Sequence, residues 1–353
     1  MRLLQNNKNK GEIMKKAKEK RSKKTSLVLK IIKIIFIFLL IIVSSVFGLY
    51  KLVTYQWQDE PQNYDTTNQY ITELGDTMVS AHRAGRKLFP QGTMMAFEGC
   101  VNSTDFETDI FEFDLHITKD EKLIILHDDT LDEVTDAVEY FGKTDNYPEN
   151  YTYEEIYNLN FGESFKNKDG ETPYKGLRGE DIPDNLRALT VTDALDFLEK
   201  SGEYYYSIEI KNSGELGFRA ADILHGILSD MKLIDRAIIA SFDKEVLLYL
   251  DEKYPDLTRI AYNVEGARLF FDALLDIDRP EGYYKFDVLQ VPPTRYIVNM
   301  GTSKLVNYAH KNNIAVHYWT INDAEKMIFL QGIGADGIIT DSPDVAYEVL
   351  NAE

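Results

Sequence analysis

The stretch Phe111–Ile117 reads FEFDLHI, and its alternation decides the fold of the chain. Side chains two positions apart on a β-strand point the same way, so Phe111 and Phe113 share one face while Glu112 and Asp114 share the other. On a buried strand two neighbouring ionised carboxylates are unfavourable unless a cation neutralises them. If that face were instead solvated, the pair would need no partner. Because the flanking phenylalanines indicate a buried strand, we favour a metal ion held by Glu112 and Asp114.

Alternating strand-like and helix-like segments extend from this stretch in both directions. Short β-rich runs lie at Met78–Ala81, Phe111–Ile117, Leu123–Leu126, Tyr204–Ile210, Ala237–Ala240, Thr258–Tyr262, Phe286–Val291, Ile314–Trp319 and Gly337–Thr340. Helical segments are expected at Met94–Asn102, Val191–Lys200, Glu215–Met231, Lys244–Lys253, Thr302–Asn312 and Ala324–Gln331, with Ser342-Pro343 opening a last helix. Repeated strand–helix units predict an α/β fold with a parallel sheet, and their number suits a TIM (β/α)8 barrel of about 250 residues.

Residues 132–188 interrupt this rhythm, because they are rich in Asp, Glu, Asn, Gly, Tyr and Pro. We expect an insertion in an early βα loop, on the face where barrel active sites lie. Leu123–Leu126 follows the preceding strand after a tight turn and is expected to form a hairpin with it. The run Gly332–Gly337 fits G-x-G-x-x-G, but it follows a helix and enters a strand. A dinucleotide-binding loop has the reverse order, so this match carries no function.

Glu209 and Lys211 form a second charged pair, at the end of the strand Tyr204–Ile210. On its own this pair would as often be a structural ion pair as a functional one. Together with Glu112 and Asp114, Glu209 becomes a third carboxylate ligand. All-oxygen ligation indicates one divalent cation, Ca²⁺ or Mg²⁺, rather than Zn²⁺. Lys211 is then placed to contact a phosphate.

Two histidines lie at the predicted C-terminal ends of strands, where barrel chemistry takes place. His82 closes one apolar run and precedes Arg83, and His127 closes another and precedes Asp128. A single histidine there would more often be structural, but two with polar neighbours indicate a general acid and a general base. Direct metal ligation by either histidine is the less favoured alternative. Arg83 is a second candidate contact for a phosphate.

The formal net charge of the chain is −19, and it is divided unevenly. Residues 1–33 hold twelve Lys or Arg and two acidic residues, whereas the rest of the chain holds 27 basic and 56 acidic residues. A domain this acidic argues against nucleic-acid binding. Cys100 is the only cysteine, so no intrachain disulfide can form and stability must come from the core.

Ile34–Tyr50 is a run of 17 uncharged residues, near the lower limit of the roughly 17–25 residues that cross a bilayer. With its flanks it predicts a transmembrane segment over residues 34–53, which would leave the basic leader, residues 1–33, in the cytoplasm. A polar tether (54–76) and the barrel (77–353) would then lie outside the cytoplasm of a single-pass cell-membrane protein. A cleaved signal peptide is the alternative, but the leader is long and no small-residue cleavage site follows.

From about Met78 to Val349 the chain resembles the glycerophosphodiester phosphodiesterase family. The matching motifs are His82-Arg83, Thr93 with Ala96-Phe97, Glu112-x-Asp114, His127-Asp128, Leu177–Thr190, Glu209-x-Lys211, Trp319-Thr320-x-Asn322 and Gly334–Pro343. The resemblance implies a TIM barrel with an inserted segment. It also implies metal ligation by Glu112, Asp114 and Glu209, acid–base chemistry by His82 and His127, phosphate contacts from Arg83 and Lys211, and an alcohol pocket lined by Trp319.

The chain departs from the family pattern at three places without losing an implied site residue. Ala84 stands for the usual glycine, Gln91-Gly92 for Glu-Asn, and Glu133-Val134 for Arg-Thr. The resemblance implies metal-dependent hydrolysis of glycerophosphodiesters to glycerol phosphate and an alcohol, at the outer face of the membrane. Two alternatives stay open. One is a related phospholipase D-type enzyme for lysophospholipid or sphingolipid head groups, and the other is a non-catalytic, membrane-anchored binding module with a barrel fold.

Overall fold

The structure is a computed structural model that describes residues 2–57 and 59–352, with the side chains of residues 2–9, 27 and 28 left out of the description. Its internal contacts divide the chain into two compact units. One is the N-terminal helix, up to Tyr55, together with Tyr296–Asn299. The other comprises Gln56–Arg295 and the chain from Met300 onward. The boundary between them falls at the start of the predicted tether.

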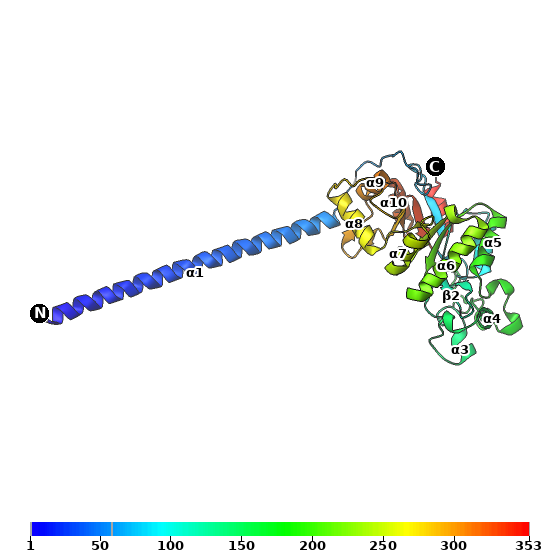
Figure 1. Ribbon diagram of the computed structural model, residues 1–353, viewed down its shortest axis with the longest axis horizontal. Coiled ribbons are helices and arrows are strands. Elements are labelled where there is room, and N and C mark those ends of the chain that lie inside the picture. Colours follow the sequence, from blue (N-terminus) through cyan, green and yellow to red (C-terminus); the bar gives the residue numbers. More distant parts are fainter. Residues whose placement is uncertain (1, 58, 353) are drawn as a thin grey trace. The chain divides into compact units, whose positions relative to one another are not determined.

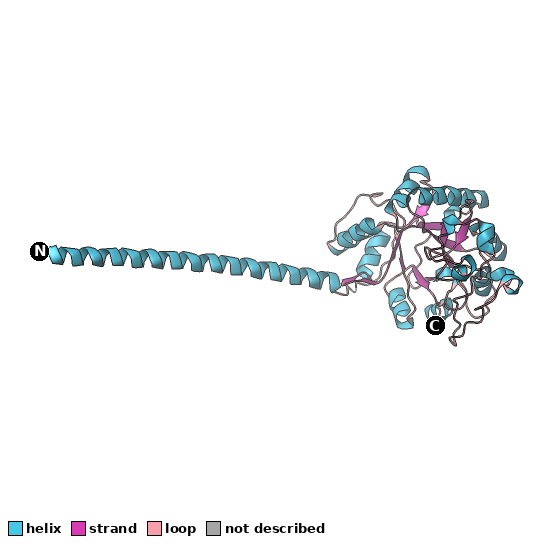
Figure 2. Cartoon of the chain, turned by 90° about the horizontal axis from the view of Figure 1, so that it is seen from below, coloured by secondary structure: helices cyan, strands magenta, loops and turns pink. Residues whose placement is uncertain are grey.

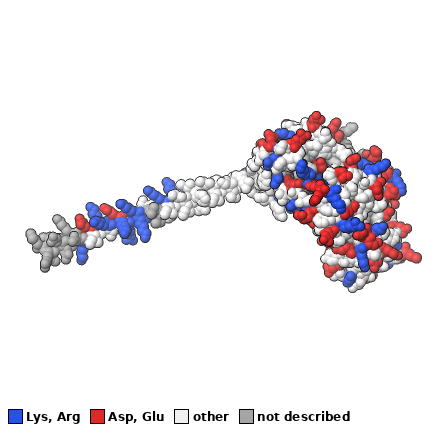
Figure 3. Space-filling view, in the orientation of Figure 1, with Lys and Arg blue, Asp and Glu red and all other residues white. Residues whose placement is uncertain are grey.

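Helix α1 spans Arg2–Thr54 and joins the basic leader and the apolar segment in one element of 53 residues. Its part from Lys10 to Thr54 is long and apolar enough to cross a membrane, and its most apolar stretch is not buried inside the protein. Basic side chains gather along the leader, and no charged residue follows Lys33 until Lys51 (Figure 3). The helix is consistent with the predicted membrane anchor, and its topology stays a prediction.

In the described part of the second unit, eight parallel strands form a nearly closed barrel. They are β1 (Met78–Ala81), β2 (Ile110–Ile117), β4 (Tyr205–Ile210), β5 (Ala237–Ala240), β6 (Thr258–Arg259), β7 (Val288–Val291), β10 (Ala315–Tyr318) and β11 (Gly337–Thr340). The hydrogen-bonded order is β6-β5-β4-β2-β1-β11-β10-β7, and a bridge between Ile260 and Val288 links the two ends. The predicted TIM (β/α)8 barrel is confirmed.

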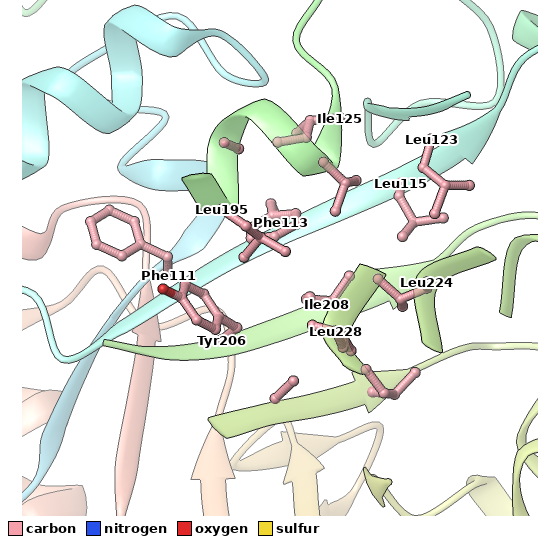
Figure 4. Close-up of a cluster of buried hydrophobic side chains, with 14 of the residues drawn as sticks. Phe111, Phe113, Leu115, Leu123, Ile125, Leu195, Tyr206, Ile208, Leu224 and Leu228 are labelled. Atoms are coloured by element: carbon pink, nitrogen blue, oxygen red, sulfur yellow. The ribbon is translucent and has the colours of Figure 1, made fainter. Parts of the chain in front are cut away.

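Helices follow most of the strands and surround the barrel (Figures 1 and 2). They are α2 (Met94–Val101), α5 (Val191–Ser201), α6 (Gly214–Met231), α7 (Lys244–Lys253), α8 (Asn263–Leu274), α9 (Ser303–Lys311), α10 (Ala324–Gly332) and α11 (Pro343–Leu350). Phe111 and Phe113 of β2 pack in one buried cluster with Leu195 of α5 and Leu228 of α6 (Figure 4). The phenylalanine face of β2 is therefore turned toward the helices, as the alternation predicted.

The hairpin and the insertion also lie where the sequence placed them. Strand β3 (Leu123–Ile125) pairs antiparallel with the end of β2. The following residues form two short helices, α3 (Ala137–Phe141) and α4 (Tyr153–Tyr157), over a small apolar cluster that includes Leu131 and Ile156. The insertion thus has a core of its own beside the C-terminal ends of the first strands.

Residues 59–76 contain no helix or strand, yet they are bound to the barrel rather than free. Asn313, just before β10, accepts a hydrogen bond of 2.8 Å from the backbone N–H of Thr67. The Tyr70 ring is buried, and its hydroxyl donates to the Asp235 carbonyl, just before β5, at 3.1 Å. Because both partners precede strands, this part of the predicted tether covers the N-terminal end of the barrel, opposite the active face.

The short helices α3 and α4 of the insertion, the helix α8 and the strands β8 and β9 were not predicted. Helix α8 was missed because Gly266 lies in its first turn, where glycine lowers helix propensity, and its apolar positions cluster near the end. The short strands β8 (Thr294–Arg295) and β9 (Val298–Asn299) lie in the loop after β7 and are too short for a periodic signal.

Candidate active site

The first strands of the barrel bring most of the predicted site residues together. β1, β2 and β4 are neighbours in the sheet, and Asp114 on β2 lies directly opposite Glu209 on β4. A single small pocket is lined by Arg83, Asp114 and His127, which come from three different segments. The clusters that the sequence singled out therefore meet at the C-terminal ends of adjacent strands.

Of the three carboxylates, Glu112 and Asp114 are buried and Glu209 is half-buried. Glu112 and Asp114 are only 7% and 2% exposed. Burial and the nearby charge of Asp114 raise the pKa of Glu112 well above its usual value, and the same two causes raise the pKa of Glu209. Oxygen Oδ2 of Asp114 is buried without a hydrogen-bond donor. The three acids therefore need positive charge nearby.

Lys211 supplies part of that charge. Its Nζ lies 3.5 Å from Asp114 Oδ1 and 2.8 Å from Glu209 Oε1, the latter an ion pair without hydrogen-bond angles. Burial alone would lower the pKa of Lys211, but the charges of Asp114 and Glu209 outweigh burial and raise it. The ammonium group therefore stays charged between two of the three acids.

The donor set fits a hard divalent cation. Carboxylate oxygens are the ligands that Ca²⁺ and Mg²⁺ prefer, and the unpartnered Asp114 Oδ2 has capacity for one more positive contact. Among the described residues, no three His, Cys, Asp or Glu side chains converge into a ready-made metal cage. Binding by Glu112, Asp114 and Glu209 together would thus need a shift of side chains, above all of Lys211.

Arg83 is held in an unusual backbone conformation. Its φ and ψ are 50° and 42°, and Ala84 and Gly85 that follow also have positive φ. Such strain persists where the surrounding contacts impose it. Here the backbone N–H of Arg83 donates to Glu112 at 2.8 Å, and its Nη1 donates to Gln91 at 2.7 Å. Its Nε lies 3.8 Å from Asp114 without a hydrogen-bond partner, so the guanidinium keeps capacity for a further anion.

His82 is fixed by a residue from the other end of the chain. Its Nδ1 lies 2.5 Å from Asp341, which directly follows β11. Asp341 also accepts hydrogen bonds from Arg86 and from Asn322. Burial lowers the pKa of His82, and the hydrogen bond to Asp341 opposes that shift in part. In the sequence only Arg83 stands beside His82, and no role was expected for Asp341.

At Asp341 hydrogen bonding outweighs burial, whereas at His82 burial outweighs hydrogen bonding. Burial alone would raise the pKa of this carboxyl, but hydrogen bonds from His82 and Arg86 outweigh it and hold the pKa below its usual range. Asp341 therefore stays ionised and holds the Nδ1 edge of the His82 ring, which leaves Nε2 for other partners.

His127 forms the second histidine–carboxylate pair. Its Nδ1 lies 2.9 Å from Asp128, the neighbour that the sequence identified. The hydrogen bond from His127 lowers the pKa of Asp128 despite its partial burial. Both histidines thus have Nδ1 beside a carboxylate, which is the arrangement that orients an imidazole for proton transfer at Nε2.

His116 has no polar neighbour in the sequence, and no role was expected for it. It lies two residues after Asp114 on the same face of β2, it is buried, and neither ring nitrogen has a hydrogen-bond partner. Burial and the charge of Lys211 lower its pKa to about 4, so it is neutral at physiological pH. The same alternation that identified Glu112 and Asp114 contained the signal for this third position.

Trp319 follows β10, three strands away from β2 in the sheet. It is half-buried, and its backbone N–H donates to the Val291 carbonyl. It does not line the pocket at Arg83 and His127, so its role toward an alcohol stays a prediction.

Comparison with known sequences identifies relatives over the whole barrel. The profile of the glycerophosphoryl diester phosphodiesterase family matches residues 82–345. A glycerophosphodiester phosphodiesterase of Bacillus altitudinis is 25% identical over 277 residues, which cover 77% of this chain and 98% of the relative. Another from Caldanaerobacter subterraneus is 27% identical over 279 residues, covering 78% of this chain and 98% of the relative.

Solved structures show the same fold. The glycerophosphoryl diester phosphodiesterase domain of a Mycobacterium tuberculosis protein superposes with a TM-score of 0.60 at 15% identity, covering 77% of this chain and 98% of that one. A phosphodiesterase of Oleispira antarctica, in complex with its product sn-glycerol-3-phosphate, gives a TM-score of 0.58 at 18% identity, covering 78% and 97%. Since the family profile spans well over half of its length, the chain belongs to the glycerophosphoryl diester phosphodiesterase family and is a phosphoric diester hydrolase.

Proposed function

We propose that the chain hydrolyses glycerophosphodiesters to glycerol phosphate and an alcohol, with a divalent cation, at the outer face of the membrane. The observation that carries this proposal is the pair of histidines, each with Nδ1 beside a carboxylate. His127 lines a pocket with Arg83 and Asp114, and His82 directly precedes Arg83. The product bound in the Oleispira antarctica relative, sn-glycerol-3-phosphate, supports the choice of substrate.

In this mechanism the two histidines move protons. One Nε2 takes the proton of the attacking hydroxyl, from water or from the neighbouring glycerol hydroxyl, as that oxygen bonds to phosphorus. The other imidazolium donates its proton to the alcohol oxygen as the phosphorus–oxygen bond breaks. Asp341 and Asp128 stabilise the positively charged ring in each case, because both stay ionised. The geometry assigns no fixed order to His82 and His127.

Arg83 and Lys211 are the proposed contacts for the phosphate oxygens. A phosphodiester resists attack because its charge repels nucleophiles, and more charge develops on its oxygens in the transition state. Both cations lie beside Asp114, so both can turn toward an anion bound next to it. Fixed positive groups in a partly buried site stabilise that charge more strongly than water does.

Glu112, Asp114 and Glu209 are the proposed metal ligands. A divalent cation is general in the family, and when bound it would add positive charge that stabilises the transition state. Lys211 would then leave its present ion pairs and turn toward the substrate. Calorimetric titration with each ion distinguishes Ca²⁺ from Mg²⁺.

The proposed location follows from α1. Its basic leader favours the cytoplasmic side, so the barrel, which begins after the apolar stretch, would face outward. Lysophospholipid or sphingolipid head groups remain a substrate alternative for an enzyme anchored in this way. The non-catalytic alternative is set aside, because family membership makes the chain a hydrolase.

The test is release of glycerol 3-phosphate from glycerophosphocholine by the full chain in detergent micelles. Activity should be present in the wild type and reduced by about 10²–10⁴-fold in His82→Ala. His225→Ala is the matched control, since His225 lies on α6 beside Asp256 and has no part in the site. Equal activity of both variants would contradict the proposal, and lipid substrates assayed in parallel separate the phospholipase alternative.

A further inference from the structure

A second cavity adjoins the catalytic pocket and has no part in the mechanism above. It has a volume of about 320 Å³ and lies between the segment after His82, the insertion, and the residue after β11. Gln91 and Val134 line both this cavity and the pocket of Arg83 and His127, so they form the wall between the two. A volume of this size accommodates a chemical group rather than a single ion.

The lining of this cavity is positively charged. Arg86, Lys87 and Lys166 contribute three cations, and Asp341 is the only acidic residue among the lining residues. The oxygens of Asp341 are already engaged by His82, Arg86 and Asn322. Asp341 therefore offers little charge to neutralise the two lysines.

Neither lysine has another acidic partner. In the described part of the chain, no Asp or Glu side chain forms an ion pair with Lys87 or Lys166. The backbone N–H of Lys87 donates to the Asp341 carbonyl at 3.2 Å, which fixes this residue at the edge of the cavity. Both lysines are exposed, and lysines without an ion pair occur elsewhere on the surface, but Lys87 and Lys166 meet at one cavity beside Arg86. Outside the leader the chain holds 56 acidic and 27 basic residues, so such a group of cations stands out against the acidic surface. Their convergence indicates an anionic ligand.

The wall between the two cavities is free of acidic side chains. Gln91 is a neutral amide whose oxygen accepts the hydrogen bond from Arg83 at 2.7 Å, and Val134 is apolar. A substrate with its scissile phosphate at Arg83 can therefore pass Gln91 and Val134 without meeting a carboxylate on this wall, and Asp341 in the cavity beyond is already bound by His82 and Arg86.

We propose that this cavity binds a second phosphate of the substrate, carried on the part of the molecule that extends past Gln91. The inference rests on the proposed function and deepens it. The preferred substrates are glycerophosphodiesters with a further phosphate, whether in a glycerol phosphate oligomer or on a phosphorylated head group. Arg86, Lys87 and Lys166 recognise that phosphate, and the shared chemistry of both sources is a second anionic centre beside the scissile one.

The test compares three substrates with the full chain. Glycerophosphocholine carries only the scissile phosphate, glycerophosphoglycerophosphate represents the oligomer, and glycerophosphoinositol phosphate represents the head group. The variants are Lys87→Gln, Lys166→Gln and the pair together. Lys285→Gln is the matched control, because this exposed lysine precedes β7 at the opposite end of the barrel.

The wild type should have a lower KM for one or both doubly phosphorylated substrates than for glycerophosphocholine, and higher ionic strength should reduce that difference. Each lysine variant should raise the KM for the preferred substrate about two- to fivefold more than the KM for glycerophosphocholine, the range for exposed ion pairs. The double variant should raise the KM for the preferred substrate about tenfold more than the KM for glycerophosphocholine. Lys166→Glu should raise the KM for the preferred substrate more than Lys166→Gln does, because it adds a negative charge. The doubly phosphorylated substrate whose KM rises in the lysine variants identifies the source of the second phosphate.

Equal changes of KM for all three substrates in the double variant, or no preference in the wild type, would overturn the inference. Glycerophosphocholine hydrolysis by the wild type keeps this result separate from the proposed function. If glycerophosphocholine is hydrolysed and the lysines make no difference, only the second phosphate site fails. If none of the substrates is hydrolysed, the proposed function fails with it.

Discussion

Replacing Asp341 by asparagine removes the charge that holds His82 while keeping the shape of the side chain. His82 loses the 2.5 Å contact that orients its ring, and the imidazolium formed during proton transfer loses its counter-charge. We expect kcat for glycerophosphocholine to fall by about 10²–10⁴-fold, the effect of losing a positioned acid or base. KM should change much less, because Asp341 does not contact the substrate phosphate in the proposed mechanism.

The same substitution has a cost in stability that can be worked from the contacts. A hydrogen bond to a charged group contributes about 1.5–3 kcal/mol, but Arg86 is 40% exposed and regains water when its partner loses charge. The bond to His82 therefore dominates, and the free energy of unfolding should fall by about 2 kcal/mol. For a domain of this size that lowers Tm by about 5 °C.

This stability difference should depend on pH. Because the folded protein holds the pKa of Asp341 below its usual value, the contribution is fully present above about pH 3.9 and is lost as the pH falls through the folded pKa. The Tm values of Asp341→Asn and the wild type should therefore converge at low pH. Thermal melts across the acid range measure this directly.

Asp256→Asn is the matched control for these measurements. Asp256 lies 3.4 Å from His225 and is 56% exposed, so it offers the same residue pair outside the site. Its loss should change the free energy of unfolding by no more than about 0.5 kcal/mol and leave kcat unchanged. A folded Asp341→Asn protein with near-normal kcat would refute the role given to the His82–Asp341 pair.

Three further predictions concern the catalytic groups, the metal and the membrane. His82→Ala and His127→Ala should each lower kcat by about 10²–10⁴-fold, and the double variant should lose far less than the product of both effects, because the pair acts as a unit; near-normal turnover of either single variant would contradict the assignment. Glu209→Gln should weaken Ca²⁺ or Mg²⁺ binding in calorimetric titrations together with activity, and an unchanged affinity would remove Glu209 from the ligand set. Protease added to intact protoplasts should digest the barrel and spare a small N-terminal fragment, whereas a protected barrel would show that the predicted topology is wrong.

The alternation along β2 was sufficient to predict which side chains face the helices and which carboxylates lie together. The alternation is predictive because side chains on a strand point in only two directions. Phe111 is buried against the helices, so Glu112 and Asp114 must point to the other face. The hairpin of β3 and the insertion were equally predictable, since a tight turn and a change of composition are local signals. His116 was predictable by the same alternation and was missed only because it had no charged neighbour in sequence.

The partner of His82 was not predictable from local pattern. Asp341 lies 259 positions away, and the two meet only because β1 pairs with β11 when the barrel closes. The left-handed backbone of Arg83 is likewise not visible in the sequence, because its N–H contacts Glu112 on β2, which is distant along the chain. Spacing likewise did not indicate that Lys211 lies between Asp114 and Glu209, where a cation was expected.

Removal of divalent cations from the full-length protein tests the central claim most directly. Three neighbouring carboxylates, two of them buried, repel one another without a cation, so a bound ion should stabilise the fold by RT ln(1 + [M]/Kd), about 2.7 kcal/mol at a hundredfold excess over Kd. Chelation should abolish release of glycerol 3-phosphate from glycerophosphocholine and lower Tm, and Ca²⁺ or Mg²⁺ should restore both. Full activity with an unchanged melting curve after exhaustive chelation would contradict the proposed site.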